Sequence, residues 1–190
     1  MKVGVLAVQG DVEEHQKALT KINVQSRSVK DESSIKAVDA LIIPGGESTT
    51  ISKLIQHHGL ADCIKEFAKQ KKPLIGTCAG MVLLAREGDD QVRKTRQNLL
   101  GLIDAKVNRN AFGSQRESFE EKIEIPVLGG NPYPCVFIRA PAYEKTGANV
   151  EVLATYQGKI IAAREGKVGV TSFHPELSGD PRLLKHLLEG

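Results

Sequence analysis

The sequence predicts an α/β fold of three layers, in which helices cover both faces of a doubly wound, mostly parallel sheet. Three short segments are almost entirely hydrophobic, namely Val3–Val8, Ala40–Ile43 and Pro73–Thr77. Such runs are typical of parallel strands that are buried on both faces. Helix-like segments separate the strands, and this alternation is the pattern of a doubly wound domain. With 190 residues, the chain has the length of one compact domain, which we expect to span residues 1–190.

The helices of the first half are expected from their end signals and from their apolar periodicity. Asp11 followed by Glu14 resembles a capping box at the start of the first helix. Ser48 is expected to cap the helix after the second strand, and Gly59 to end it. Three segments carry side chains at helical spacing: Val12, His15, Leu19 and Ile22; Ile51, Leu54 and Ile55; and Leu60, Ile64 and Phe67.

The second half is richer in strands. Short apolar segments separated by Gly, Lys and Asn turns are expected to be strands: Val136–Ile138, Val152–Tyr156, Ile160–Arg164 and Val168–Ser172. Asp180 and Pro181 are expected to begin a last helix, whose apolar positions are Leu183, Leu184, Leu187 and Leu188. Residues 86–98 are mostly charged or polar, which predicts a solvated surface loop.

Composition excludes several classes of function. The net charge is only +3, and no stretch combines Lys and Arg with aromatic residues, so we expect no nucleic-acid binding. Apolar runs fall far short of the roughly 18 residues that span a bilayer, so we expect no membrane segment. The N-terminus begins directly with a strand-like run, without the pattern of a secretion signal. Three cysteines without CxxC spacing favour a reduced, cytoplasmic compartment, with no disulfide framework and no zinc site. We expect no metal site and no bound cofactor.

Cys78 has the sequence setting of a catalytic nucleophile. A buried strand leads into Gly76-Thr77-Cys78-Ala79-Gly80, which has the spacing of a nucleophile elbow with Cys in place of Ser. The helix that follows places the sulfur at a helix N-terminus, which favours the thiolate, and the amide of Ala79 can donate to an oxyanion. An isolated cysteine is more often a small buried hydrophobe. The flanking glycines favour the nucleophile, whereas Cys63 and Cys135 lack such a setting and are expected to be structural.

His174 is the expected general base, with Glu176 as the residue that orients it. Pro175 disfavours helical angles at His174, and residues two apart in an extended segment point to the same side. A carboxylate beside the imidazole would fix its tautomer and stabilise the imidazolium. The other histidines lie in helix-like segments, where a structural role is expected: His15, His57, His58 and His186.

Three further segments are candidates for binding a substrate. Gly45 and Gly46 follow the second strand, at a carboxyl end where open α/β sheets bind ligands, and they could supply a second oxyanion donor. A simple strand-to-helix turn explains the same pattern equally well. Arg109 and Arg139 have the side chain that pairs with carboxylates, although each on its own would be read as a surface arginine.

Together these segments resemble the glutaminase subunit of the two-component pyridoxal 5′-phosphate synthase, within the class I glutamine amidotransferases and their flavodoxin-like fold. The motifs that carry the resemblance are VQGDVEEH, PGGEST, GTCAGM, RNAFGSQ, FIRAP and SFHPEL. They extend from Val3 to the last helix. The motifs GxCxG and HPE specify only the broader class I glutamine amidotransferases. The motifs VQG, GGES and RNxFG narrow the resemblance to the glutaminase subunit.

The resemblance implies a function and a set of site residues. Such glutaminases hydrolyse L-glutamine to L-glutamate and ammonia through a cysteine thioester. The implied catalytic residues are Cys78, His174 and Glu176, and the implied glutamine-binding residues are Gly46, Glu47, Ser48, Arg109, Ile138 and Arg139.

The resemblance also implies a partner. The ammonia goes to a synthase subunit that joins it to a pentose phosphate and a triose phosphate, in an assembly with twelve copies of each subunit. The glutaminase is poorly active until docked, and Gln9 and Gly10 correspond to a loop that responds to docking. Ser114 stands where the family usually has arginine, which puts in doubt a partner contact at that position.

Two alternatives remain open at this point. A related cysteine hydrolase, such as a small peptidase of similar fold, could share the elbow, but its pocket would not require an arginine pair. A binding module that retains the fold without catalysis would not be labelled at Cys78 by a glutamine-like electrophile.

Overall fold

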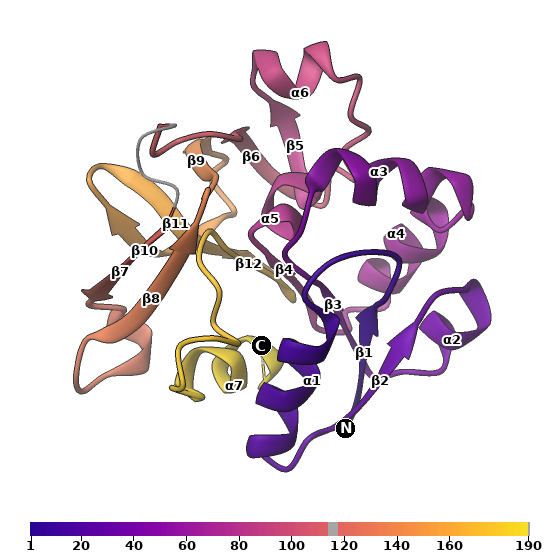
Figure 1. The fold of residues 1–190 in the computed structure, drawn as a ribbon, viewed down its shortest axis with the longest axis horizontal. Helices are drawn as coiled ribbons and strands as arrows, with labels where there is room; N and C mark the ends of the chain where they lie inside the picture. The colour runs from indigo at the N-terminus through magenta and orange to yellow at the C-terminus, as the bar shows by residue number, and fades with distance from the viewer. Residues whose placement is uncertain (114–117, 190) are drawn as a thin grey trace.

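The computed structural model describes residues 1–113 and 118–189, which form a layered α/β structure around one large sheet (Figure 1). The strands are β1 Lys2–Leu6, β2 Gln25–Val29, β3 Ala40–Ile43, β4 Leu74–Thr77, β5 Ala85–Gly88, β6 Ile103–Asn108, β7 Ser118–Ile123, β8 Tyr133–Ile138, β9 Ala142–Thr146, β10 Glu151–Tyr156, β11 Lys159–Glu165 and β12 Val168–Thr171. The helices are α1 Val12–Lys21, α2 Glu32–Lys36, α3 Ser48–His57, α4 Ala61–Lys69, α5 Ala79–Leu84, α6 Asp90–Lys94 and α7 Arg182–Glu189, with a 3₁₀ turn at Pro126–Leu128.

One half of the large sheet is parallel. Over the described residues its strand order is β2-β1-β3-β4-β12-β11-β9-β6-β5, with β10 paired to β11. The pairs from β2 through β12 are all parallel, and Thr77 lies opposite Thr171 at the end of β4 and β12. The carboxyl ends of β1, β3, β4 and β12 therefore meet at one edge, where open α/β sheets hold their ligands.

The other half of the sheet is mainly antiparallel. Strand β11 pairs antiparallel with β12, β9 and β10, and β6 pairs antiparallel with β9. Strands β7 and β8 form a separate antiparallel pair beside the large sheet (Figure 1). The predicted fold class, an α/β structure with a mostly parallel sheet, is confirmed.

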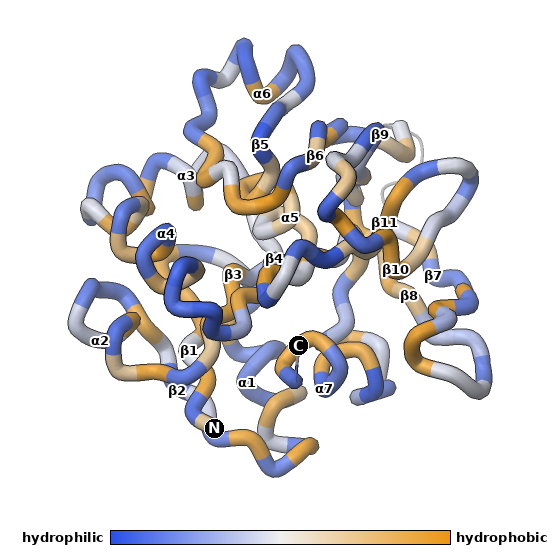
Figure 2. The backbone as a smooth tube through the Cα atoms, turned by 180° about the vertical axis from the view of Figure 1, so that it is seen from behind, coloured by the Kyte–Doolittle hydropathy of each residue, from blue (hydrophilic) through white to orange (hydrophobic). Residues whose placement is uncertain are grey.

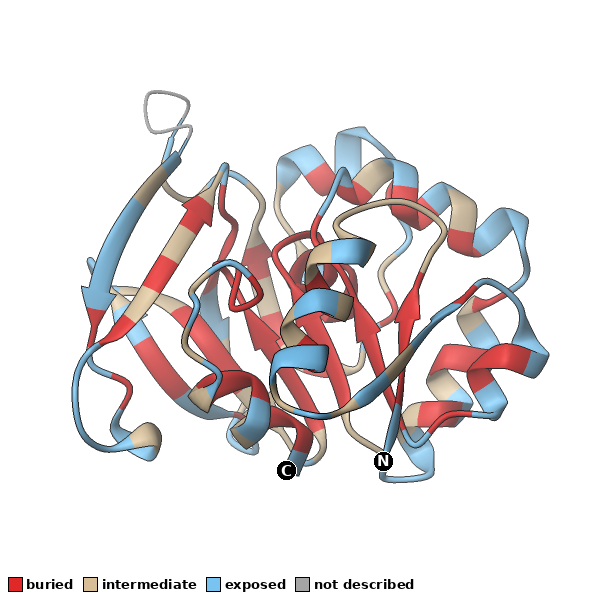
Figure 3. Ribbon diagram, turned by 60° about the horizontal axis from the view of Figure 1, so that its bottom comes forward, coloured by how far each residue is buried: buried red, intermediate tan, exposed pale blue. Residues whose placement is uncertain are grey.

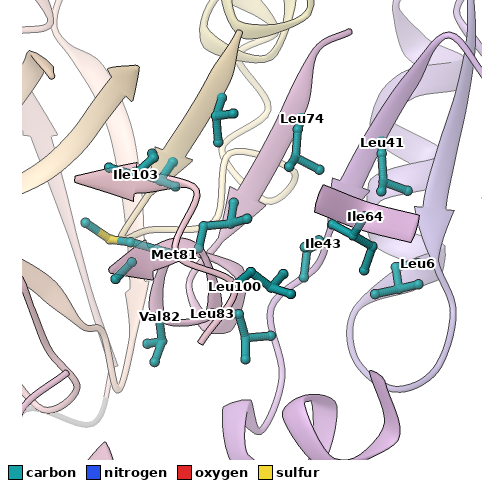
Figure 4. Close-up of a cluster of buried hydrophobic side chains, with 14 of the residues drawn as sticks. Leu6, Leu41, Ile43, Ile64, Leu74, Met81, Val82, Leu83, Leu100 and Ile103 are labelled. Atoms are coloured by element: carbon teal, nitrogen blue, oxygen red, sulfur yellow. The ribbon is translucent and has the colours of Figure 1, made fainter. Parts of the chain in front are cut away.

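Two hydrophobic clusters occupy the two faces of the sheet. On one face, β-strand residues such as Leu41 and Leu74 pack with Ile64 of α4 and Leu83 of α5 (Figure 4). On the other face, the leucines of α1 and α7 pack with alternate residues of the same strands, including Ile42. The central strands are buried, while the outer sides of the helices are exposed (Figure 3). Burial on both faces explains why these strands read as continuous hydrophobic runs.

The helix ends differ in part from expectation. Glu47, rather than Ser48, caps α3, because its carboxylate accepts hydrogen bonds from the backbone of Thr49 and Thr50 at 3.0 and 2.7 Å. Asp11 lies before α1 without any side-chain capping bond, so the predicted capping box is also wrong. Gly59 has a φ of +65° just after α3, which confirms it as the residue that ends that helix.

Residues 86–98 are not a simple solvated loop. They contain the end of β5 and helix α6, which Asp89 caps by accepting from the backbone of Val92 at 2.9 Å. The segment is mostly hydrophilic (Figure 2), but Val92 and Gln97 are buried beneath it. The sequence expectation failed here because few of its residues are buried, and hydrogen bonds to distant residues, such as Asp89 with Arg109 and Asn98 with Ser52, also hold the segment in place.

Other differences concern strands with polar sequences. Strands β2, β6, β7 and β9 were not expected, because their residues include many charged or polar side chains. Cys135 lies within β8 and is fully buried. Among the described residues, no helix is both long and apolar enough to cross a lipid bilayer.

Candidate active site

Cys78 lies in a sharp turn between β4 and α5. Its φ of +50° and ψ of −98° are unusual for a residue with a side chain, as in a nucleophile elbow. A Cβ atom on Gly80 would lie 2.3 Å from the carbonyl oxygen of Ile43, and one on Gly76 would lie 2.7 Å from the backbone of Gly80. Small residues on both sides of Cys78 are therefore required by close backbone contacts.

The structure brings the predicted Cys78, His174 and Glu176 together. His174 follows β12, and its backbone N–H donates to the carbonyl oxygen of Val136 on β8 at 2.8 Å. Its Nδ1 donates to Glu176 Oε1 at 2.7 Å, and both side chains are almost completely buried. The backbone N–H of Cys78 donates to Thr171 at 2.8 Å, which fixes the elbow against the strand that carries His174.

The electrostatic setting of His174 favours its charged form. Burial alone would lower the pKa of His174, but hydrogen bonds and charge interactions with Cys78 and Glu176 outweigh burial and raise that pKa to about 10. A histidine with a raised pKa beside a cysteine favours an imidazolium next to a thiolate. Such a pair can attack a carbonyl carbon and then protonate a leaving group.

His15 belongs to this group, which sequence reasoning did not predict. It is fully buried on α1, and its Nε2 lies 3.4 Å from Glu176 Oε2 and 3.0 Å from Thr77 Oγ1. The sequence predicted only a structural role for His15 within a helix, and the structure adds that its ring contacts Glu176. Periodicity shows only that His15 lies on the inner face of α1, not which residues that face contacts.

A cavity of about 470 Å³ opens onto Cys78. This volume is in the range of small-molecule sites. All the expected substrate-binding residues line it together with Cys78 and His174, namely Gly46, Glu47, Ser48, Arg109, Ile138 and Arg139. Glu176 does not line the cavity but lies behind His174. Asp11, Ala79, Val82, Gln91, Asn110 and Pro141 also contribute to the wall.

Glu47 and Arg109 form an ion pair at the cavity wall. Arg109 donates to Glu47 Oε1 and, at 2.9 Å, to Thr49 Oγ1. Burial works to raise the pKa of Glu47, but hydrogen bonds from Thr50 and Thr49 and the charge of Arg109 lower it to about 2. Glu47 is therefore a fixed negative charge that faces the cavity.

Arg139 carries the other guanidinium of the cavity. It follows β8 with a φ of +43°, a conformation that residues with side chains rarely adopt. Within the described part of the chain, no hydrogen bond or ion pair holds its guanidinium. The carbonyl oxygen of the preceding residue, Ile138, lies 3.8 Å from Cys78 Sγ. The side chain of Arg139 therefore begins close to the nucleophile.

The α6 segment supports the same cavity. Asp89 Oδ2 accepts from the backbone N–H of Arg109 at 2.8 Å, so one residue caps α6 and positions Arg109. Ser48 Oγ donates to Gln97 Oε1 at 3.3 Å in a buried contact. The N-capping position of Asp89, three residues before Val92, was the sequence signal that could have identified α6.

The segment after β6 is anchored by an aromatic residue. Phe112 packs against the rings of Phe119, Phe137 and Tyr156, with centroids 5.5 to 6.1 Å apart. This anchoring holds the turn that begins at Arg109. Ser114, at which the sequence departs from the family pattern, lies outside the described residues.

The N-terminal loop contacts the glycine loop that follows β3. Gln9 Oε1 accepts from the backbone N–H of Glu47 at 3.1 Å, and the backbone N–H of Asp11 donates to the oxygen of Gly45 at 3.1 Å. Gly46 has a φ of +148°, and a Cβ atom there would lie 2.7 Å from Gln9 Oε1. The conformations of the two loops are therefore coupled.

One group of side chains has the composition of a metal site. Among the described residues, Asp11, His174 and Glu176 bring ligand atoms within 4.8 Å of one another. His174 Nδ1 is already bonded to Glu176, and Asp11 Oδ2 lies 3.7 Å from the same nitrogen. Two carboxylates therefore lie near the N–H of the imidazole, an arrangement that stabilises the protonated form of His174.

The chain is similar over its whole length to known proteins. Pyridoxal 5′-phosphate synthase subunit PdxT of Archaeoglobus fulgidus is 49% identical over an alignment that covers 100% of this chain and 98% of that protein. The protein of the same name from Pelotomaculum thermopropionicum is 48% identical, with 100% and 94% covered. A crystal structure of a glutamine amidotransferase has a TM-score of 0.91 and 44% identity, with 98% and 97% covered.

A more distant structural neighbour shares only the fold. A putative GMP synthase subunit from Thermoplasma acidophilum has a TM-score of 0.66 at 14% identity, with 100% of this chain and 92% of that chain covered. The family model of the SNO glutamine amidotransferase family matches residues 5–189. The chain belongs to the SNO glutamine amidotransferase family.

Proposed function

We propose that this protein is the glutaminase subunit of a pyridoxal 5′-phosphate synthase. It hydrolyses the side-chain amide of L-glutamine to L-glutamate and ammonia, and the ammonia supplies a synthase subunit in vitamin B6 biosynthesis. The observation that carries the chemistry is Cys78 beside a buried His174–Glu176 pair at the wall of a cavity that also holds two arginines. The pathway is supported by full-length similarity to the PdxT proteins.

The proposed reaction is acyl transfer through a thioester. The Cys78 thiolate attacks the amide carbon of glutamine, and the resulting oxyanion is held by backbone amides near Gly46 and Ala79. The His174 imidazolium gives its proton to the departing nitrogen, so ammonia leaves as the carbon–nitrogen bond breaks. Neutral His174 then takes a proton from water, and the hydroxide attacks the thioester to release glutamate and regenerate Cys78.

The charges of the cavity support an amino-acid substrate. Glu47 neutralises Arg109, whereas the guanidinium of Arg139 is not paired within the described residues, so Arg139 can bind the α-carboxylate of glutamine. The fixed charge of Glu47 can bind the α-ammonium group. The Ser48 hydroxyl, held by Gln97, completes the polar wall.

Docking of the synthase subunit is proposed to act through the N-terminal loop. Gln9 is hydrogen-bonded to Glu47, and a Cβ atom on Gly10 would lie only 2.0 Å from the oxygen of Gly45. A displacement of Gln9 and Gly10 must therefore also move the glycine loop that follows β3. We expect the free subunit to be poorly active and the complete assembly to contain twelve copies of each subunit.

The organisation and location of the chain are part of the same proposal. Residues 1–190 are taken as one glutamine amidotransferase domain, because both hydrophobic clusters pack on a single large sheet. A cytoplasmic location is supported by three cysteines that are all free thiols.

The proposal is tested by measuring glutamate formation from glutamine with and without a candidate synthase subunit. Activity should rise on addition of the synthase. Cys78→Ala should still bind the synthase but release no ammonia, while Cys63→Ala, which removes a thiol on α4 away from the cavity, should remain active. Glutamine hydrolysis by Cys78→Ala at the unmutated rate would overturn the mechanism.

A further inference from the structure

Glu176 is contacted by two imidazoles, one through each carboxylate oxygen. Its Oε1 accepts from His174 Nδ1 at 2.7 Å, and its Oε2 lies 3.4 Å from Nε2 of His15. The side chains of Glu176 and His15 are both completely buried. No solvent is available to either group, so each depends on protein contacts for its polar atoms.

The orientation of the His15 ring is determined by its other nitrogen. Nδ1 lies 2.9 Å from the carbonyl oxygen of Asp11, and because a carbonyl oxygen can only accept, Nδ1 must donate. Nε2 is directed at the region between Thr77 Oγ1, at 3.0 Å, and Glu176 Oε2. Hydrogen bonds thereby fix the ring at two points, the start of α1 and the residue before Cys78, with Nε2 facing the carboxylate behind His174.

Glu176 needs a second contact that the predicted triad does not supply. Among the described residues, Oε2 has no hydrogen-bond donor although it is buried. A buried carboxylate oxygen without a donor is costly, and it leaves the carboxylate free to rotate away from His174. His15 Nε2 faces this oxygen at 3.4 Å, and it donates to Oε2 when the ring carries a proton on both nitrogens, because the proton of the neutral ring is on Nδ1.

We propose that His15 is a positioning residue for the reaction, which holds the Glu176 carboxylate in the orientation that aligns His174. This inference rests on the proposed glutaminase function. His15 also bonds to the carbonyl oxygen of Asp11, which adjoins the loop that contains Gln9 and Gly10, so it connects the N-terminal loop with the charge behind the base. It does not line the cavity and does not touch the substrate.

Two substitutions separate positioning from simple anchoring of α1. His15→Asn keeps a donor near the place of Nδ1 and so can retain the bond to Asp11, but it has nothing at the place of Nε2. His15→Gln places an amide near the position of Nε2, in reach of Thr77 and Glu176. If His15 positions Glu176, His15→Gln should retain more activity than His15→Asn, whereas the order should reverse if it only anchors α1.

The expected result, measured with the synthase subunit present, is a change in kcat without a change in KM. His15→Asn should lose about 10-fold in kcat, the order expected for losing one hydrogen bond to a charged group, and His15→Gln less than about 3-fold. Leu19→Ala is the matched control, because it weakens the packing of α1 without contacting Glu176 and should lower stability while leaving kcat unchanged.

A double-mutant cycle identifies the group through which His15 acts. In the Glu176→Gln background, His15→Asn should cause no further loss beyond about 2-fold, because the carboxylate it positions is already gone. Losses that multiply, equal losses for the Asn and Gln variants, or a rise in KM at unchanged kcat would each overturn the inference.

A spectroscopic measurement covers the case in which His15→Asn does not fold. In ¹⁵N-histidine NMR spectra of the unmutated chain and of Glu176→Gln, the ring nitrogens of His15 should shift together with those of His174, and an unchanged His15 would overturn the inference. The two proposals fail differently. Absence of glutamine hydrolysis by the unmutated complex would reject the glutaminase function, whereas an active complex with a fully active His15→Asn would reject only the role of His15.

Discussion

Glu176→Gln tests whether the carboxylate behind His174 contributes to catalysis rather than to binding. The bond from His174 Nδ1 to Glu176 Oε1 is 2.7 Å long, and both side chains are buried. A hydrogen bond to a charged group contributes about 1.5 to 3 kcal/mol, which corresponds to about 10- to 150-fold in rate. The loss can be larger if the glutamine amide donates to Nδ1, because that stabilises the tautomer that cannot take a proton from Cys78.

The assay is steady-state glutamate formation with the synthase subunit present. Because Glu176 does not line the cavity, KM should change by less than about 3-fold while kcat carries the loss. Glu13→Gln makes the same chemical change on the exposed side of α1, where the carboxylate is 81% exposed, and should leave both constants unchanged. A kcat for Glu176→Gln within 2-fold of the unmutated enzyme would refute the assignment, and thermal unfolding of both variants shows whether the fold is intact.

Arg139→Ala should raise the KM for glutamine about 10- to 100-fold through loss of a charged hydrogen bond, with kcat nearly unchanged. Arg96→Ala is its control, because Arg96 is exposed and has a similar positive φ of +50°. Equal KM values for Arg139→Ala and Arg96→Ala would exclude Arg139 as a glutamine ligand, and this is the result expected if the protein is a hydrolase with another substrate. Gly80→Ala should lower both stability and kcat, because its Cβ would lie 2.3 Å from a backbone oxygen. Gly169→Ala is the control and should retain kcat, because its Cβ would meet only the end of the Leu187 side chain, at 2.7 Å. Full activity of Gly80→Ala in steady-state assays would show that the elbow tolerates a side chain at position 80. The pKa of His174 is raised to about 10 from an ordinary 6.5, so the stability that its charged form contributes is fully present below pH 6.5 and is lost as the pH rises through about 10. The free energy of unfolding in urea should therefore differ less and less between the unmutated chain and His174→Gln over that pH range. A constant difference would contradict the raised pKa.

Local features of the sequence predicted the catalytic set. The elbow at Cys78 was predictable because the close approach of the backbone requires glycine at positions 76 and 80, each two residues from Cys78 in the sequence. The pairing of His174 with Glu176 was predicted from an extended segment, whereas the structure has a turn over residues 175–177, in which the backbone N–H of Leu177 donates to the oxygen of His174 at 3.1 Å. In both cases the residues that must meet lie within a few positions of one another.

Features that depend on a partner elsewhere in the chain were predicted less well. Ser48 was expected to cap α3, but its hydroxyl bonds to Gln97, and Glu47 takes the capping role while it pairs with Arg109. Residues 86–98 looked like a surface loop because Val92 and Gln97 are the buried residues among them, and their other connections are hydrogen bonds to distant segments, such as those between Asn98 and Ser52. A capping preference is weak enough for one tertiary contact to reverse it.

The sequence by itself determined the βα alternation, the buried parallel strands, the elbow at Cys78 and the His174–Glu176 pair, because hydrophobic runs, glycine requirements and proline restrictions act on neighbouring residues. Only the tertiary structure decided that His15 reaches Glu176, since that contact depends on how α1 packs on the sheet. Helical periodicity shows which face of α1 is buried, but the partner across that face is set by the packing of segments far apart in the chain.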